Sequence, residues 1–197
     1  MNRPCVLAAA AALLVAMGGY LAQGEPGLAS VPGALPASDP ALGAALIAER
    51  RQLAGEAVPD ADSWMVIGDA MARHGQYPEA VEVLSGAVER RPRNAQAWLA
   101  IANALAANVG GRMTPAADFA LVQAAGADPQ SPGPAYFRAA ALACSGDAAE
   151  ARELWSGLLD KPPANASWRP LVELRLGQLD RTGTARPGCI AEARPCC

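Results

Sequence analysis

The chain has 197 residues, of which 52% are hydrophobic but only 5% aromatic, and small alanine supplies much of the apolar content. Such a composition favours helix. The net charge of −3, without an extended block of lysine or arginine, argues against a protein that binds nucleic acid through a basic face.

Residues 1–23 contain an uncharged apolar run long enough, at about 20 residues, for a helix that spans a bilayer. Two interpretations remain open. One is a signal peptide cleaved near Ala22-Gln23-Gly24, and the other is an uncleaved anchor with Tyr20 at the membrane interface. Both place the following residues outside the cytoplasm. Residues 24–39, rich in proline and glycine, are predicted to form an extended tether.

A helix is predicted to begin at Pro40, with Ser38 or Asp39 as its N-cap. It runs to about Leu53, and Gly55 stops it. We expect this helix to close the N-terminal end of the domain that follows.

The next stretch has the spacing of a tetratricopeptide repeat, a 34-residue pair of antiparallel helices. With Ala61 as position 1, the signature positions are Trp64, Gly68, Gly75, Tyr77, Ala80, Leu84, Ala87 and Pro92. Small residues at Gly68 and Ala80 let the two helices approach closely. Gly75 permits the turn between them, and Pro92 ends the second helix.

The pattern recurs twice, which predicts repeats at about 61–94, 95–131 and 132–165. The second unit is three residues longer than the ideal, and the insertion falls where Thr114 caps a helix that Pro115 begins. In the third unit Arg138 breaks the pattern. A helix over 167–180, with Arg169, Glu173 and Arg175 on a polar outer face, is predicted to cap the array.

The predicted fold is therefore all-α: a tetratricopeptide helical-hairpin solenoid of about three repeats with capping helices, over residues 40–180. A polar tail, 181–197, follows and contains Cys189, Cys196 and Cys197. In an oxidising compartment Cys189 could pair with Cys196 or Cys197. Cys144 is interpreted as a buried small hydrophobe. A redox role for the tail is a weaker alternative.

No pattern predicts catalysis, a cofactor or a metal. The single histidine, His74, is expected near a surface turn, and the chain has no C-x-x-C-H motif for covalent haem attachment. Binding is the remaining class of function. The tetratricopeptide resemblance implies a concave groove lined by the first helix of each unit, suited to a peptide or helix. Its candidate contacts are Met65, Asp69, Arg73, Leu99, Asn103 and Tyr136.

The order of parts also resembles the periplasmic portion of cytochrome c maturation factors of the CcmI/CycH type. The matching stretches are "GGYLAQGEPGL", "NALAANVGGRMTPAA" and "GDAAEARELWSGLL". The chain departs from that family in having one apolar span instead of two. The resemblance implies a bacterial inner-membrane protein, with its C-terminal domain in the periplasm, that holds the C-terminal helix of apocytochrome c and presents it to the haem ligation complex. A generic cell-envelope scaffold of the same fold is the alternative.

Overall fold

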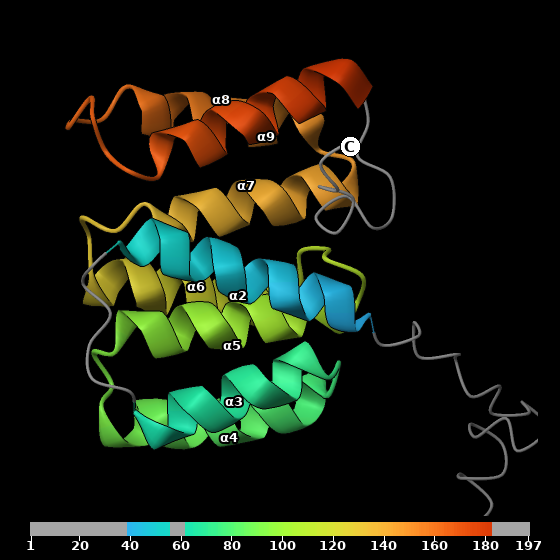
Figure 1. Ribbon diagram of the computed structural model, residues 1–197, viewed down its shortest axis with the longest axis vertical. Helices are drawn as coiled ribbons and strands as arrows, with labels where there is room; N and C mark the ends of the chain where they lie inside the picture. Colours follow the sequence, from blue (N-terminus) through green and yellow to red (C-terminus); the bar gives the residue numbers. More distant parts are fainter. Residues whose placement is uncertain (1–38, 56–61, 183–197) are drawn as a thin grey trace, which may run out of the picture. The chain divides into compact units, whose positions relative to one another are not determined.

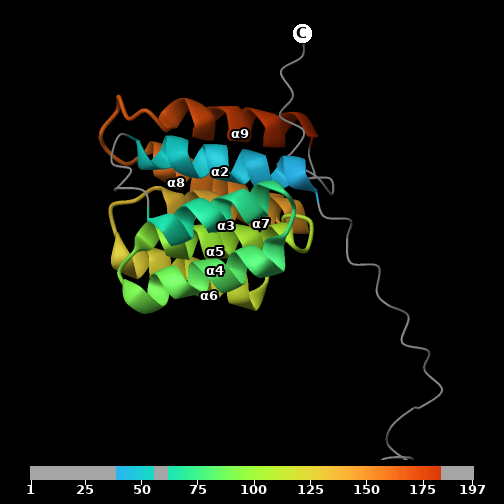
Figure 2. The same cartoon turned by 60° about the horizontal axis from the view of Figure 1, so that its bottom comes forward.

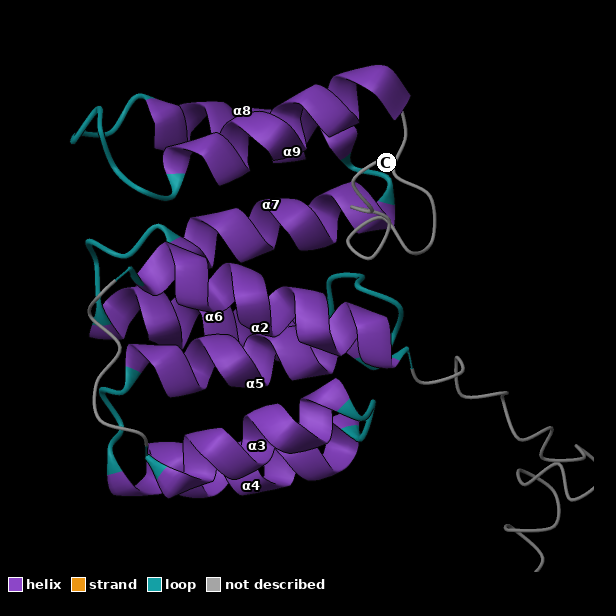
Figure 3. Cartoon of the chain, viewed as in Figure 1, coloured by secondary structure: helices purple, strands orange, loops and turns teal. Residues whose placement is uncertain are grey.

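The computed structural model describes residues 39–55 and 62–182, and these ranges form helices joined by turns, with no strand (Figures 1 and 3). The predicted membrane segment, most of the tether and the three tail cysteines lie outside the described residues. None of the described helices is long and apolar enough to cross a membrane. The helices are α2 (Pro40–Ala54), α3 (Ser63–Arg73), α4 (Tyr77–Arg90), α5 (Ala95–Ala107), α6 (Pro115–Ala127), α7 (Gly133–Ser145), α8 (Ala148–Leu159) and α9 (Arg169–Thr182).

Six of these helices pair into three antiparallel hairpins, α3 with α4, α5 with α6 and α7 with α8. Small residues let paired helices approach, as the sequence predicts. A Cβ atom added to Gly68 of α3 would lie 2.6 Å from Leu84 of α4. The ring of Trp64 packs in the same way over Gly86, whose added Cβ would meet it at 3.1 Å. Larger side chains at these two glycines would separate the helices.

The turns also follow the sequence signals. Gly75 and Gly146 end the first helices of their hairpins with φ angles of 75° and 99°, which residues with a Cβ rarely adopt. In the second hairpin the insertion is a longer turn between α5 and α6. Thr114 then caps α6 by accepting a hydrogen bond from the amide of Ala117 at 3.1 Å.

Helix α2 begins and ends as predicted, but it does not close the end of the array. It packs against α3, α5 and α7, the first helices of the three hairpins, and a side chain of α9 forms an ion pair with it. In both views it lies between α3 and α9 (Figures 1 and 2). The prediction that α2 closes the N-terminal end of the array is therefore wrong. In its observed position α2 buries Leu42, Leu46, Ile47 and Leu53 in the common hydrophobic core.

The end that α2 was expected to close has exposed apolar side chains instead. Val66 and Ile67 of α3 are 52% and 47% exposed. Ile101 holds the same repeat position as Ile67 one unit later and is only 5% exposed, because the preceding hairpin covers it. Among the described residues, no hairpin precedes α3.

Candidate functional site

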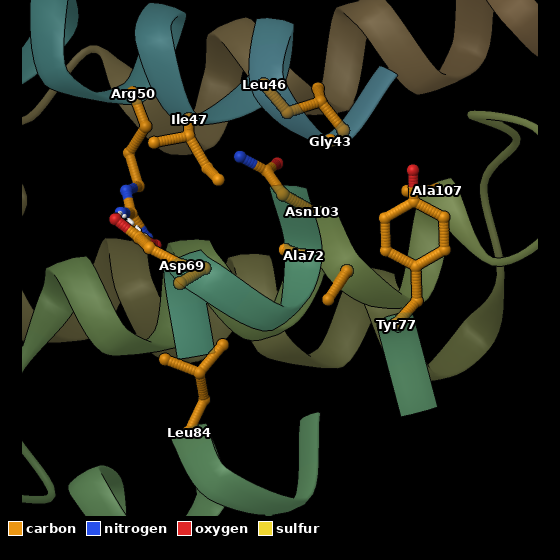
Figure 4. Close-up of a pocket in the computed structure, with 12 residues that line it drawn as sticks. Gly43, Leu46, Ile47, Arg50, Asp69, Ala72, Tyr77, Leu84, Asn103 and Ala107 are labelled. Carbon is orange, nitrogen blue, oxygen red and sulfur yellow. Dashed lines mark hydrogen bonds and ion pairs between the residues drawn. The ribbon is translucent and has the colours of Figure 1, made fainter. Parts of the chain in front are cut away.

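The six candidate contacts predicted from the repeat pattern lie on α3, α5 and α7, the helices that α2 packs against. Leu99 and Tyr136 are fully buried, and the polar side chains of Asp69 and Asn103 are buried as well. Met65 and Arg73 are half-buried. Figure 4 shows Arg50 of α2 reaching Asp69 of α3, and Leu46, Ile47 and Asn103 line the same space. The space left between them is about 10 Å³, roughly the room for one water molecule.

A buried ion pair joins α2 to α3. One guanidinium nitrogen of Arg50 donates to both carboxylate oxygens of Asp69, at 2.6 and 2.7 Å. Arg51 adds a longer contact of 3.3 Å from the solvent side. Burial lowers the pKa of Arg50, and the attraction of Asp69 opposes that effect. The pair fixes α2 against the first hairpin, although burial disfavours its cation.

A second buried ion pair joins α2 to α9. Arg175 is paired with Glu49, while its Nε donates to the hydroxyl of Tyr136 at 3.1 Å and its Nη1 donates to Gln178 at 2.9 Å. Burial raises the pKa of Glu49, against the opposing attraction of Arg175. The prediction that Arg175 belongs to a polar outer face is wrong, since its side chain is buried. Its partner on α2 supplies the charge that makes this burial tolerable.

Backbone contacts set the depth at which α2 lies. A Cβ atom on Gly43 would be 2.0 Å from the carbonyl oxygen of Ala72 in α3 and 3.2 Å from the ring of Tyr77. Only a glycine allows this approach. The hydroxyl of Tyr77 also donates to the carbonyl of Asp39, the residue that caps α2. The N-terminal half of α2 is therefore held through main-chain atoms and its C-terminal half through charged side chains.

An open cleft of about 1020 Å³ lies where the C-terminal end of α2 meets the N-terminal ends of α3 and α5. Two candidate contacts, Met65 and Asp69, line it. Its rim is charged: Arg91 pairs with Asp62 at 3.1 Å, and both side chains belong to the lining. This cleft is the part of the predicted groove that α2 leaves open.

Two further predictions concern reactive side chains. Cys144 is buried as predicted, and it is also disulfide-bonded. The predicted burial is confirmed, whereas the disulfide was not predicted for this cysteine. His74 is exposed at the C-terminal end of α3. Within residues 39–55 and 62–182, no group of three or more His, Cys, Asp or Glu side chains could hold a metal ion.

Sequence reasoning missed the α2 residues that complete this site, Gly43, Glu49 and Arg50. One signal was present: Glu49 and Arg50 lie one turn after Leu46 and Ile47, on the side of the helix that is apolar. Residues three and four apart share a helix face, so this spacing indicates that the two charges are buried with the leucine and isoleucine. Nothing in the sequence indicated their partners.

The repeated hairpins and the face that they form define a tetratricopeptide repeat protein. The family model described as tetratricopeptide repeat matches residues 36–92 and 65–132, and the first match includes α2.

Within that class, the chain is a CycH-like protein. It is 31% identical over 170 residues to "Cytochrome c-type biogenesis protein CycH" of Rhizobium meliloti (strain 1021), a match that covers 86% of this chain and 44% of the relative. It is 28% identical over 176 residues to the protein of the same name from Bradyrhizobium diazoefficiens, covering 87% of this chain and 48% of that relative. The chain thus spans less than half the length of these curated relatives.

Proposed function

We propose that this protein acts in cytochrome c maturation by binding, without catalysis, the C-terminal helix of an apocytochrome c and presenting it to the haem ligation complex. The observation that carries the proposal is the position of α2. A helix lies across the first helices of all three hairpins, so this face has the shape and chemistry to accept one. The names of the two relatives support a role in this process.

The proposal places the domain in the periplasm, tethered to the bacterial inner membrane through residues 1–23. The disulfide at Cys144 supports an oxidising compartment, because disulfides persist outside the cytoplasm and are rare within it. The proposed partners are therefore the apocytochrome helix, membrane proteins of the haem ligation complex, and the membrane itself.

The test is calorimetric titration of the purified full chain with a synthetic peptide that copies the C-terminal helix of a c-type cytochrome. We expect a Kd of about 1 µM or lower, the range of specific but reversible binding. A folded protein that binds no such peptide would overturn the proposal. Co-purification of an unrelated envelope complex in that case would favour the scaffold alternative.

Variants must be chosen from residues that are not part of the core. Leu99→Asp or Tyr136→Asp would bury an unpaired carboxylate and would test folding more than binding. Met65→Glu and Arg73→Glu alter half-buried groove residues and should weaken binding by about tenfold or more. Phe119→Glu, on the exposed surface of α6, is the matched control and should leave the Kd unchanged.

A further inference from the structure

We propose that α2 occupies, in the free protein, the site that a partner helix takes in the complex, so that α2 must leave before the partner binds. The inference rests on the proposed function and specifies its ligand. The partner is an amphipathic helix that reproduces the buried side of α2: aliphatic side chains, one small residue, and an acidic residue followed directly by a basic one.

The residues of the groove floor, Leu99, Asn103 and Tyr136, are buried, and the space of about 10 Å³ that remains under α2 cannot admit a helix about 10 Å in diameter. A second helix cannot enter between α2 and this floor. Binding to the floor residues and docking of α2 therefore exclude each other.

The side chains on the buried side of α2 define which helix fits this face. Aliphatic side chains at positions 42, 46, 47 and 53 of α2 are buried, and Gly43 brings the backbone close to Ala72. Glu49 and Arg50 are adjacent in sequence but point to opposite walls, toward Arg175 of α9 and Asp69 of α3. A helix with these two charges exchanged would face each wall with a like charge. The groove therefore selects the direction and register of the helix that it holds.

Burial of charge makes the docked position of α2 costly. Docking of α2 removes four charged groups from water, and ion pairs inside a protein often fail to compensate fully for lost hydration. The pKa of Arg50 is lowered and that of Glu49 is raised, so burial outweighs the attraction of the partner for these two α2 side chains, whereas at Arg175 burial is outweighed by the attraction of Glu49 and the pKa is raised. Release of α2 returns Glu49 and Arg50 to water, which offsets part of the cost of displacing it.

The first test uses the unmodified full chain and measures hydrogen exchange of the α2 amides, with and without the cytochrome helix peptide. Residues 40–54 should exchange slowly in the free protein and at least tenfold faster when the peptide is saturating. Amides of α5 and α7 should stay protected. A saturated complex in which α2 stays protected would overturn the inference, while the proposed function would stand with binding elsewhere, for example in the open cleft.

The second test does not depend on the cytochrome. A labelled peptide of residues 39–55 is titrated into the wild-type chain and into the Gly43→Ala chain, in which docking of the tethered α2 is weakened. The peptide itself keeps Gly43. It should bind the variant about 2- to 30-fold more tightly than the wild type. The tethered α2 competes with the peptide for the groove, so weaker docking of α2 raises the apparent affinity for the peptide by the same factor.

A control peptide with Glu49→Arg and Arg50→Glu should bind neither protein. Equal affinity of the two peptides, or equal affinity of the two proteins for the native peptide, would overturn the inference. If the α2 peptide behaves as expected but the cytochrome peptide does not bind, the proposed function fails. The groove is then a helix site for a different partner.

Discussion

Replacing Gly43 by alanine tests how closely α2 approaches the first hairpin. Inside a helix, glycine to alanine normally stabilises by up to about 1 kcal/mol, because alanine loses less backbone entropy on folding. At Gly43 the new Cβ would lie 2.0 Å from the carbonyl oxygen of Ala72, a main-chain atom that cannot rotate away. Overpacking of this kind costs about 1–3 kcal/mol. We therefore expect Gly43→Ala to destabilise the protein by roughly 0.5–2 kcal/mol.

The matched control is Gly157→Ala in α8, where a Cβ would meet nothing within 4 Å. It should stabilise by a few tenths of a kcal/mol to about 1 kcal/mol, through propensity alone. The assay is urea unfolding of each full chain, followed by circular dichroism. Stabilisation by both substitutions would refute the close approach of α2, because the propensity gain would then act at Gly43 without opposition.

Three further predictions concern charges and the disulfide. Arg50→Ala should lower the free energy of unfolding in urea by about 3–5 kcal/mol, because it leaves Asp69 buried without its main partner. The control is Arg138→Ala, whose ion pair with Asp118 is solvent-exposed and whose loss should cost no more than about 1 kcal/mol. Equal losses in the two variants would contradict the burial of the Arg50–Asp69 pair. The pKa of Glu49 in the folded protein is raised above its ordinary 4.5, so above pH 4.5 the folded state keeps a proton that the unfolded state releases. As the pH rises, the free energy of unfolding of the wild type should therefore fall relative to that of Glu49→Gln, by at most about 1.4 kcal/mol per pH unit. A constant or rising difference would show that Arg175 dominates. Finally, mass spectrometry of a non-reduced digest should find Cys144 linked to another cysteine peptide, and free alkylation of Cys144 in the folded, unreduced protein would contradict its bonded state.

Local signals in the sequence predicted the hairpins well. The small residue at Gly68, the turn at Gly75 and the cap at Thr114 each contact neighbours within one repeat. Their spacing in the sequence is therefore enough to predict the hairpins. Even the exception at Arg138 has a local explanation, since it pairs with Asp118 on the preceding helix. A repeat fold can be recognised from one sequence because the same packing pattern recurs in every unit.

The position of α2 could not be predicted in the same way. Its ends were clear from Asp39, Pro40 and Gly55, but its place depends on contacts between distant parts of the chain. Glu49 and Arg175 are 126 residues apart, and each alone has the pattern of a solvated charge on a helix. For the same reason the helix that packs across α3, α5 and α7, which carry the predicted groove residues, was not foreseen.

Calorimetric titration of the cytochrome helix peptide into the wild-type and Gly43→Ala chains tests most directly whether a foreign helix and α2 share one site. Competition predicts that the variant binds about 2- to 30-fold more tightly, although it is the less stable protein. Equal or weaker binding by a folded Gly43→Ala chain would contradict a shared site.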